Sequence, residues 1–251
     1  MKADRPWAEL IHGPDGAKMS KRHGALGVDA YRDQGFLPEA MRNYLLRLGW
    51  AHGDEEIIST EQAIEWFNLE SVGRSASRFD FVKLTNLNGH YMRNGDDSAL
   101  AELIAPSIAK KRGKDLDNED MNLLERVMPG LKERAKNVHE LADSAQFYFS
   151  KAPLEFTDKA LAQLTEDGCS HLNQLSSEFS ELATWDAQSI EAHVRAYSER
   201  PDPAIKLGKI AQPLRAALSG STVSPPIFDV MALLGRDETL TRINEAIKLQ
   251  G

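Results

Sequence analysis

The sequence has few of the features that mark secreted, membrane or zinc-binding proteins. It contains one cysteine, Cys169, among 251 residues, which excludes an internal disulfide framework. No run approaches the roughly 20 apolar residues that a membrane helix needs, and no signal peptide is recognisable. Without paired thiols or a histidine cluster, Cys169 is expected to be a small buried side chain. These absences predict a cytoplasmic protein with no zinc, no other metal ligands and no membrane partner.

Strand-like alternation of apolar and polar residues is also scarce, whereas helical spacing recurs along the chain. Pro38 stands at the first turn of one apolar-periodic stretch, and Gly49 follows it as a stop. Ser59 and Gln62 have the spacing of a capping box. The chain is therefore predicted to be mainly α. Beyond a helix that follows Asp80, helices are expected at 97–110, 118–127, 131–149, 157–165, 171–182, 186–198, 204–218, 227–234 and 237–249.

Basic residues are fewer than acidic ones. The sequence has 30 Lys and Arg and 38 Asp and Glu, which gives a net charge of −8. Nucleic-acid binding is driven by cationic side chains that release counterions, so this composition alone does not suggest RNA. The distribution is uneven, however. Basic residues gather at 110–114 and 206–215, while acidic residues gather at 54–56, 115–120 and 178–181. Such a patchy surface favours oriented local binding of a polyanion over tight non-specific adhesion.

The most informative cluster is Lys18-Met19-Ser20-Lys21-Arg22, which has glycines on both sides. Two ammonium groups and a hydroxyl on a backbone with glycine neighbours can approach a polyphosphate. They can also neutralise charge that develops on an α-phosphate and a departing pyrophosphate. The alternative interpretation is a solvated surface turn with ordinary positive charge.

The wider string from Gly13 to Ala25 resembles the KMSKS-type signature loop of class I aminoacyl-tRNA synthetases, and specifically that of the bacterial glutamyl-tRNA synthetases. Four blocks in family order, the signature loop included, carry the resemblance from Gly13 onward. The other three blocks lie at 44–50, at 83–93 and at 212–236. The middle of the chain, at about 94–205, matches only in its helical character.

The resemblance implies roles for particular residues. Lys18, Ser20 and Lys21 would act in catalysis, with Lys21, Met19 and Arg22 at the bound ATP. Four residues would approach the anticodon of tRNA, namely Arg215, Ser224, Pro225 and Ile227. ATP with Mg²⁺, glutamate and a glutamate-specific tRNA are the implied ligands of the intact enzyme, which is expected to be a monomer.

The C-terminal block also has a chemistry of its own. Arg215 lies on a predicted helix and has a planar fork of donors that suits a base edge or a phosphate. Residues 220–226 must form an extended loop because tandem prolines forbid a helix. Ile227 and Phe228 either offer apolar surface to bases or begin a core helix.

Nearer the N-terminus, Arg74, Arg78 and Lys83 lie where a tRNA backbone would pass in the family arrangement, although exposed arginines are common.

Two polar breaks, at 94–97 and 151–153, suggest three parts. Residues 1–95 would hold the signature loop and a helical stem-contact region. Residues 96–155 and 156–251 would be two helical bundles of an anticodon-binding domain. The paired-histidine motif of the family's nucleotide-binding domain is absent, since His12-Gly13 and Gly89-His90 are isolated. The chain is thus predicted to be a C-terminal fragment that is inactive in aminoacylation by itself.

The function that these observations favour is glutamate-tRNA ligation, the ATP-dependent attachment of glutamate to tRNA. One alternative is a noncatalytic tRNA-binding or interaction module. A weaker alternative is a nondiscriminating enzyme that also charges glutamine tRNA, and this property is not readable from one sequence. Amino-acid specificity would reside mainly in the absent domain.

Overall fold

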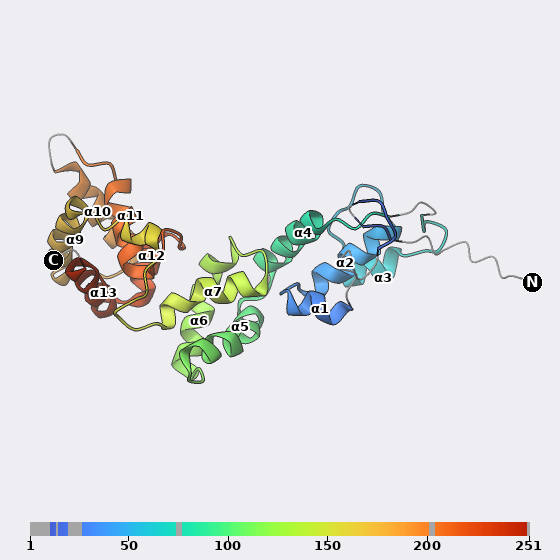
Figure 1. The fold of residues 1–251 in the computed structure, drawn as a ribbon, viewed down its shortest axis with the longest axis horizontal. Coiled ribbons are helices and arrows are strands. Elements are labelled where there is room, and N and C mark those ends of the chain that lie inside the picture. The colour runs from blue at the N-terminus through green and yellow to red at the C-terminus, as the bar shows by residue number, and fades with distance from the viewer. Residues whose placement is uncertain (1–10, 14, 20–26, 74–76, 201–203, 250–251) are drawn as a thin grey trace, which may run out of the picture. The chain divides into compact units, whose positions relative to one another are not determined.

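The computed structural model describes residues 11–13, 15–19, 27–73, 77–200 and 204–249, and within them the chain is helical with no strand longer than an isolated bridge (Figure 1). This confirms the mainly α prediction. No helix in these ranges is long and apolar enough to cross a membrane.

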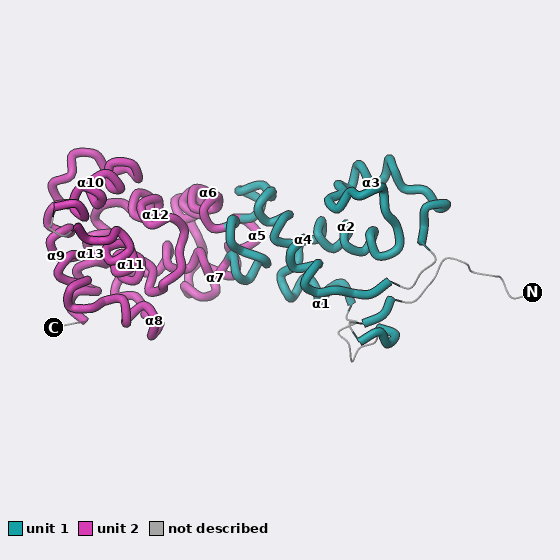
Figure 2. Tube along the Cα trace, turned by 90° about the horizontal axis from the view of Figure 1, so that it is seen from above, with its two compact units in different colours: residues 1–100, 132–141 teal, residues 101–131, 142–251 magenta. Residues whose placement is uncertain are grey.

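The chain divides into two compact units, which Figure 2 shows in different colours. Unit 1 comprises Met1–Leu100 and Lys132–Leu141, and unit 2 comprises Ala101–Leu131 and Ala142–Gly251. The helices that lie wholly in unit 1 are α1 Val28–Asp33, α2 Pro38–Gly49, α3 Thr60–Trp66 and α4 Phe81–Asn94. The finer division into parts at 1–95, 96–155 and 156–251 stays a prediction.

The core of unit 1 is an aromatic cluster between α2 and α4. Tyr44 of α2 meets Phe79 edge to face at 4.9 Å between ring centroids. Leu84 of α4 is fully buried beneath them. Edge-to-face pairs such as this one stabilise the core beyond what the burial of apolar area contributes, and they give the rings a defined orientation. The segment that leads into α4 is thereby fixed against α2.

Two buried asparagines hold the connections around this core. Asn88 accepts a hydrogen bond from the Leu37 backbone N–H at 2.7 Å and donates one to the Lys136 carbonyl at 2.6 Å. Asn43 accepts from Ile58 N–H at 2.5 Å and donates to the Glu56 carbonyl at 3.0 Å. Buried backbone groups outside helices need such partners, because losing one costs about 1–3 kcal/mol. Both asparagines therefore replace secondary-structure bonds in loops.

Unit 2 is a helical bundle. It holds most of α5 Asp97–Arg112, α6 Asn118–Lys132 and α7 Val138–Phe149, followed by α8 Asp158–Leu161, α9 Glu166–Ser180, α10 Ala187–Glu199, α11 Gly208–Ser219, α12 Ile227–Leu234 and α13 Arg236–Lys248. In the C-terminal part α9 and α11 both pack against α13 and against each other, while α10 packs against α12. Fully buried Leu172, Phe179 and Ile243 fill the interior.

The predicted helix at 131–149 is wrong over residues 133–137. The structure continues α6 through Pro129 and Gly130 to Lys132 and begins α7 only at Val138. Asn137 explains the break, because its side chain accepts a hydrogen bond from Glu140 N–H at 2.9 Å, as an N-terminal cap does. Pro129 is tolerated inside α6 because Val127, Met128 and Leu131 are buried and hold the helix in place.

Threonine caps explain a second difference. The helix predicted at 157–165 is one turn long, because a second cap interrupts it and starts α9 at Glu166 rather than at residue 171. Thr157 accepts from Ala160 N–H at 3.2 Å, and Thr165 accepts from Gly168 N–H at 3.1 Å. The predicted bounds of α12 are confirmed, as is the capping box of Ser59 and Gln62.

Candidate nucleotide and nucleic-acid interfaces

The described part of the Lys18–Arg22 cluster, Lys18 and Met19, is the end of a short turn. His12 and Lys18 form an antiparallel bridge, and Met19 N–H donates to the Ile11 carbonyl at 2.8 Å. Between them Asp15 accepts from Ala17 N–H at 3.0 Å. The next residue, Gly16, has φ of 79°, a conformation that favours glycine. The backbone is therefore turned back on itself just before Lys18.

The two described residues of the cluster point to different environments. Lys18 is exposed, whereas Met19 is half-buried and packs against the aromatic core of unit 1. Met19 thus lies in an apolar environment. The remaining predicted catalytic and ATP-contact residues, Ser20, Lys21 and Arg22, lie outside the described residues.

The base of this turn is bonded to a second segment of unit 1. His12 N–H donates to the Ser77 carbonyl at 2.8 Å, and Phe79 N–H donates to the His12 carbonyl at 2.8 Å. Phe79 is in turn 3% exposed within the core cluster. Three consecutive residues therefore connect the lysine-bearing turn to the buried rings, and the intervening residue is Arg78.

Arg78 lines a pocket of about 510 Å³ between α2 and α4. Its basic residues also include Arg47, Lys83 and His90, and apolar side chains such as Leu48 and Leu87 form part of the wall. We call it the α2–α4 pocket. Arg47 is paired with Glu56 at 3.3 Å. Two of the three cations that the sequence suggested for a tRNA backbone, Arg78 and Lys83, thus line one concave surface, and Arg74 lies outside the described residues.

A second cluster of predicted residues lies in unit 2, around the loop between α11 and α12. Arg215 of α11 donates through Nε to Ser224 Oγ at 2.9 Å, and Ser224 Oγ donates to the Pro225 carbonyl at 2.8 Å. Ser224 and Ile227 are 5% and 4% exposed. Arg215 is half-buried. The structure therefore brings these four residues together, with three of them buried and the guanidinium nearer to solvent.

Pro225 and Ile227 hold the loop rather than extend from it. A Cβ placed on Gly130 of α6 would lie 3.2 Å from Pro225 Cβ, so the proline ring occupies the space beside that glycine. Ile227 begins α12 as a buried residue, in agreement with the core-helix alternative. Val223, by contrast, is 64% exposed at the loop tip.

The start of the same loop is equally constrained. Gly220 ends α11 with φ of 66°, in the left-handed region that favours glycine. Its carbonyl accepts from Thr157 N–H at 2.9 Å. A Cβ at this position would lie 2.1 Å from the Glu155 carbonyl oxygen, so only glycine fits. The loop from residue 219 to 226 is thus fixed at both ends, and we call it the α11–α12 loop.

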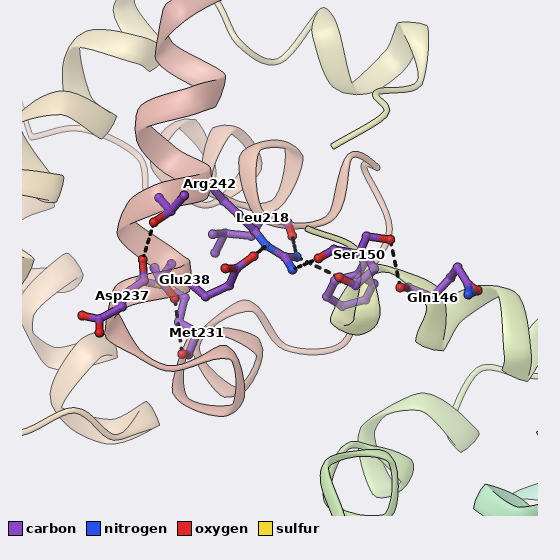
Figure 3. Close-up of polar contacts among 10 residues, drawn as sticks. Gln146, Ser150, Leu218, Met231, Asp237, Glu238 and Arg242 are labelled. Carbon is purple, nitrogen blue, oxygen red and sulfur yellow. Dashed lines mark hydrogen bonds and ion pairs between the residues drawn. The ribbon is translucent and has the colours of Figure 1, made fainter. Parts of the chain in front are cut away.

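Sequence reasoning missed Arg242 of α13, the most deeply buried cation among the described residues. Its side chain is 1% exposed, and its Nε donates to Glu238 at 2.6 Å. Figure 3 shows its guanidinium among the backbone carbonyls of neighbouring helices. The i,i+4 spacing of Glu238 and Arg242 is typical of an exposed helix pair, so the sequence carries no signal for this burial.

Two titratable groups outside these clusters, Glu178 and Cys169, have shifted pKa values with structural causes. Hydrogen bonds from Arg200 and, more weakly, from His193 lower the pKa of Glu178, whose carboxylate ties α9 to α10. Burial raises the pKa of the Cys169 thiol, which keeps it protonated and unreactive. In the part of the chain that the structure describes, no three His, Cys, Asp or Glu side chains are arranged to hold a metal ion.

Two family models match the chain. Residues 99–247 match the model described as an anticodon binding domain, and residues 2–86 match the model described as the catalytic domain of class I tRNA synthetases (E and Q). The first match covers most of unit 2, including the α11–α12 loop. The second covers the lysine-bearing turn and most of the residues that line the α2–α4 pocket.

Similar proteins carry consistent names. A protein named glutamate--tRNA ligase 2 from Paramagnetospirillum magneticum is 61% identical over 95% of this chain and 50% of its own length. Its namesake from Rhodospirillum centenum is 58% identical over 95% of this chain and 51% of its own length. The crystal structure of a glutamate tRNA ligase from Elizabethkingia meningosepticum, in complex with its amino acid, superposes with a TM-score of 0.80 at 27% identity, over 95% of this chain and 50% of that one. The chain spans about half the length of these relatives.

Proposed function

The chain belongs to the anticodon binding domain family, and from this premise we propose that it is the C-terminal, tRNA-binding region of a bacterial-type glutamate--tRNA ligase. The observation that carries the proposal is the Arg215–Ser224 hydrogen bond within the matched segment. It orients a planar guanidinium from a loop that is fixed at both ends. Arginine in such a position suits a base edge in a single-stranded anticodon.

In this proposal the α2–α4 pocket holds the tRNA backbone at a second place. Arg78 and Lys83 are both exposed and line this pocket. Two cations attract a phosphate group more strongly than one cation does. In the same proposal the apolar side chains of Leu48 and Leu87 would pack against a ribose. Contacts of this type position the nucleic acid but do not read its sequence, so specificity is assigned to the α11–α12 loop.

The chemical step proposed for the whole protein has two stages. The glutamate carboxylate attacks the α-phosphate of ATP and releases pyrophosphate. The terminal ribose hydroxyl of tRNA then attacks the glutamyl carbonyl of the adenylate, which forms the ester and releases AMP. Lys18 lies at the exposed end of a turn that is bonded to the core, so its ammonium group can meet phosphate oxygens. Mg²⁺ would accompany the ATP phosphates, as is usual for this ion. In this proposal the protein carries out the aminoacylation in the cytoplasm.

The test is an equilibrium titration of the 251-residue chain with glutamate tRNA and with a copy altered in the anticodon. We expect tighter binding of the unaltered tRNA, because the α11–α12 loop belongs to this chain. Equal affinities for the two RNAs would contradict the assignment of the loop to the anticodon.

A noncatalytic tRNA-binding role is the second candidate, and the extent of the matches favours it for the chain by itself. The catalytic-domain model matches only residues 2–86, and the relatives are about twice as long. We therefore expect the chain alone to bind tRNA without forming glutamyl-tRNA in an assay with ATP and glutamate. Formation of glutamyl-tRNA by the purified chain would contradict this second proposal and favour a complete enzyme.

A further inference from the structure

The buried cation Arg242 lies where two helices of unit 2 end. Its Nη1 donates to the Phe147 carbonyl at 2.9 Å and to the Leu218 carbonyl at 2.7 Å, and its Nη2 donates to the Ser150 carbonyl at 2.7 Å (Figure 3). Phe147 belongs to the last turn of α7, and Ser150 follows that helix directly. Leu218 belongs to the last turn of α11. One guanidinium thus bridges α13 to the C-terminal ends of two other helices.

This arrangement satisfies groups that would otherwise be costly to bury. The last four carbonyls of a helix have no partner within it, and the helix dipole gives this end a partial negative charge. A buried guanidinium without partners would also be costly. Arg242 offers five N–H donors, of which four are used by Glu238 and the three carbonyls. The charge and the helix ends therefore compensate each other.

The contact with Leu218 lies at the entrance to the α11–α12 loop. Ser219 and Gly220 follow Leu218 directly, and Gly220 is bonded to Thr157. Ser224, which bonds Arg215, comes six residues after Leu218. The exit of α11 is therefore determined by Arg242 on one side and by the segment at Thr157 on the other.

We propose that Arg242 is a positioning residue for anticodon recognition, which acts through the Leu218 carbonyl to hold the α11–α12 loop in its binding geometry. The proposal rests on the proposed function, because it takes this loop to be the part that meets the anticodon. Arg242 itself touches no nucleic acid, since its side chain is 1% exposed. Its effect is to keep Arg215 and Ser224 in one fixed place relative to α13 and α7.

The experiment compares Arg242→Met and Arg242→Lys with Ile104→Ala in the full chain. Methionine keeps the length and removes the donors, and lysine keeps the charge and some of the donors. Ile104 is fully buried in α5, so its truncation lowers stability without removing the Arg242 contacts. Thermal unfolding measures the stability of each variant, so that affinities are compared at conditions of equal stability. The readouts are the ratio of affinities for glutamate tRNA and for an anticodon-altered copy, and amide hydrogen exchange at Gly220 and Thr157 without RNA.

We expect Arg242→Met to lower the affinity ratio by about tenfold and to speed exchange at both amides. Arg242→Lys is expected to restore part of the ratio, and Ile104→Ala to leave it unchanged at matched stability. If Arg242→Met does not fold, the comparison of Arg242→Lys with Ile104→Ala decides in the same way. Unchanged exchange at Gly220 and Thr157, or an equal loss of the ratio in Ile104→Ala, would overturn the proposal.

The affinity ratios of the parent chain and of Arg242→Met also separate this inference from the proposed function. If the parent chain does not distinguish the two RNAs, the proposed function fails, whatever happens in the variants. If the parent chain distinguishes them while Arg242→Met does so equally well, the proposed function stands and the positioning role fails.

Discussion

At the residue scale, each of the two predicted functional clusters pairs a group that could meet a ligand with apolar or hydroxyl neighbours that hold it. Lys18 is exposed next to Met19, which packs on the core of unit 1. Arg215 is half-buried beside Ser224, which is buried. A ligand-binding side chain gains accuracy when its neighbours restrict its rotamers. The substitutions of greatest interest are therefore those that remove the charged group and leave the support intact.

Replacing Lys21 by alanine tests the catalytic assignment, which comes from sequence because this residue lies outside the described ranges. In an enzyme with a complete catalytic domain we expect Lys21→Ala to lower turnover by about 10² to 10³, with a smaller change in ATP affinity. The reason is that the ammonium group meets charge that develops mainly in the transition state. ATP-dependent rates measured at saturating glutamate provide the check, and equal rates for variant and parent would refute the role.

Replacing Arg215 by alanine tests the anticodon contact. We expect the loss to be about 1–3 kcal/mol in tRNA binding and confined to RNAs with the unaltered anticodon, because a base edge would lose its partner. Titrations with both RNAs measure it. Arg195→Ala is the control, since Arg195 is an exposed residue of α10 that pairs with Glu191 in its own helix. An unchanged affinity for the unaltered tRNA would remove Arg215 from the interface.

At the scale of elements, the sequence predicted helices where capping and spacing agree and missed where they conflict. Pro38 and Gly49 bound α2 as expected, and α12 has its predicted bounds. The predicted helices at 118–127 and 131–149 left a break at 128–130, yet burial of the neighbouring apolar residues keeps α6 continuous through Pro129. Local propensity loses here because tertiary packing supplies more free energy than one proline costs.

The tie between α9 and α10 makes a prediction about pH. Because the hydrogen bond from Arg200 lowers the pKa of Glu178 below its ordinary value of 4.5, the ionised carboxylate adds stability at neutral pH. This contribution is lost as the pH falls through the lowered pKa, where the carboxylate takes up a proton. His193 faces the same carboxylate, with its Nε2 2.7 Å from a Glu178 oxygen. Urea unfolding of the parent chain and of Arg200→Met should therefore differ at pH 7 and converge below pH 4.5.

The matched control for this measurement is Arg195→Met, which breaks an exposed pair within α10 itself. Such pairs contribute little to stability, so we expect its curve to follow the parent at each pH. A constant difference between Arg200→Met and the parent over the whole pH range would contradict the role of the carboxylate.

At the scale of the whole molecule, the net charge of −8 means that the proposed RNA binding depends on where the cations are concentrated. If Arg78 and Lys83 contact phosphates, Arg78→Met and Lys83→Met should each weaken binding equally for both anticodon variants. Each should also reduce the slope of log affinity against log salt by about 1, because one fewer counterion is released. Titrations at several salt concentrations measure this. Lys159→Met, an exposed position of α8, is the control, and an equal effect there would show that net charge alone matters.

The sequence predicted the mainly α class and proposed the two candidate clusters, but it did not indicate the buried polar residues that support them. Asn43, Asn88 and Arg242 are polar residues that bond backbone atoms distant along the chain. Composition and helical spacing place such residues on exposed faces, since polar side chains are mostly exposed. Their partners are carbonyls and N–H groups, which every residue has, so no local pattern marks them. Only the tertiary arrangement identifies them as structural.

Gly130 has no side chain, and this allows α6 to pack directly against Pro225 of the α11–α12 loop. Since the Pro225 ring fills this space at 3.2 Å from where a methyl group would stand, substitution by alanine would displace the proline by a few tenths of an ångström. The shift would reach the hydroxyl of Ser224, the residue before Pro225, and the guanidinium that this hydroxyl orients. If the α11–α12 loop reads the anticodon, as proposed, a change in α6 would therefore tune which tRNAs the protein accepts while Arg215 and Ser224 stay the same.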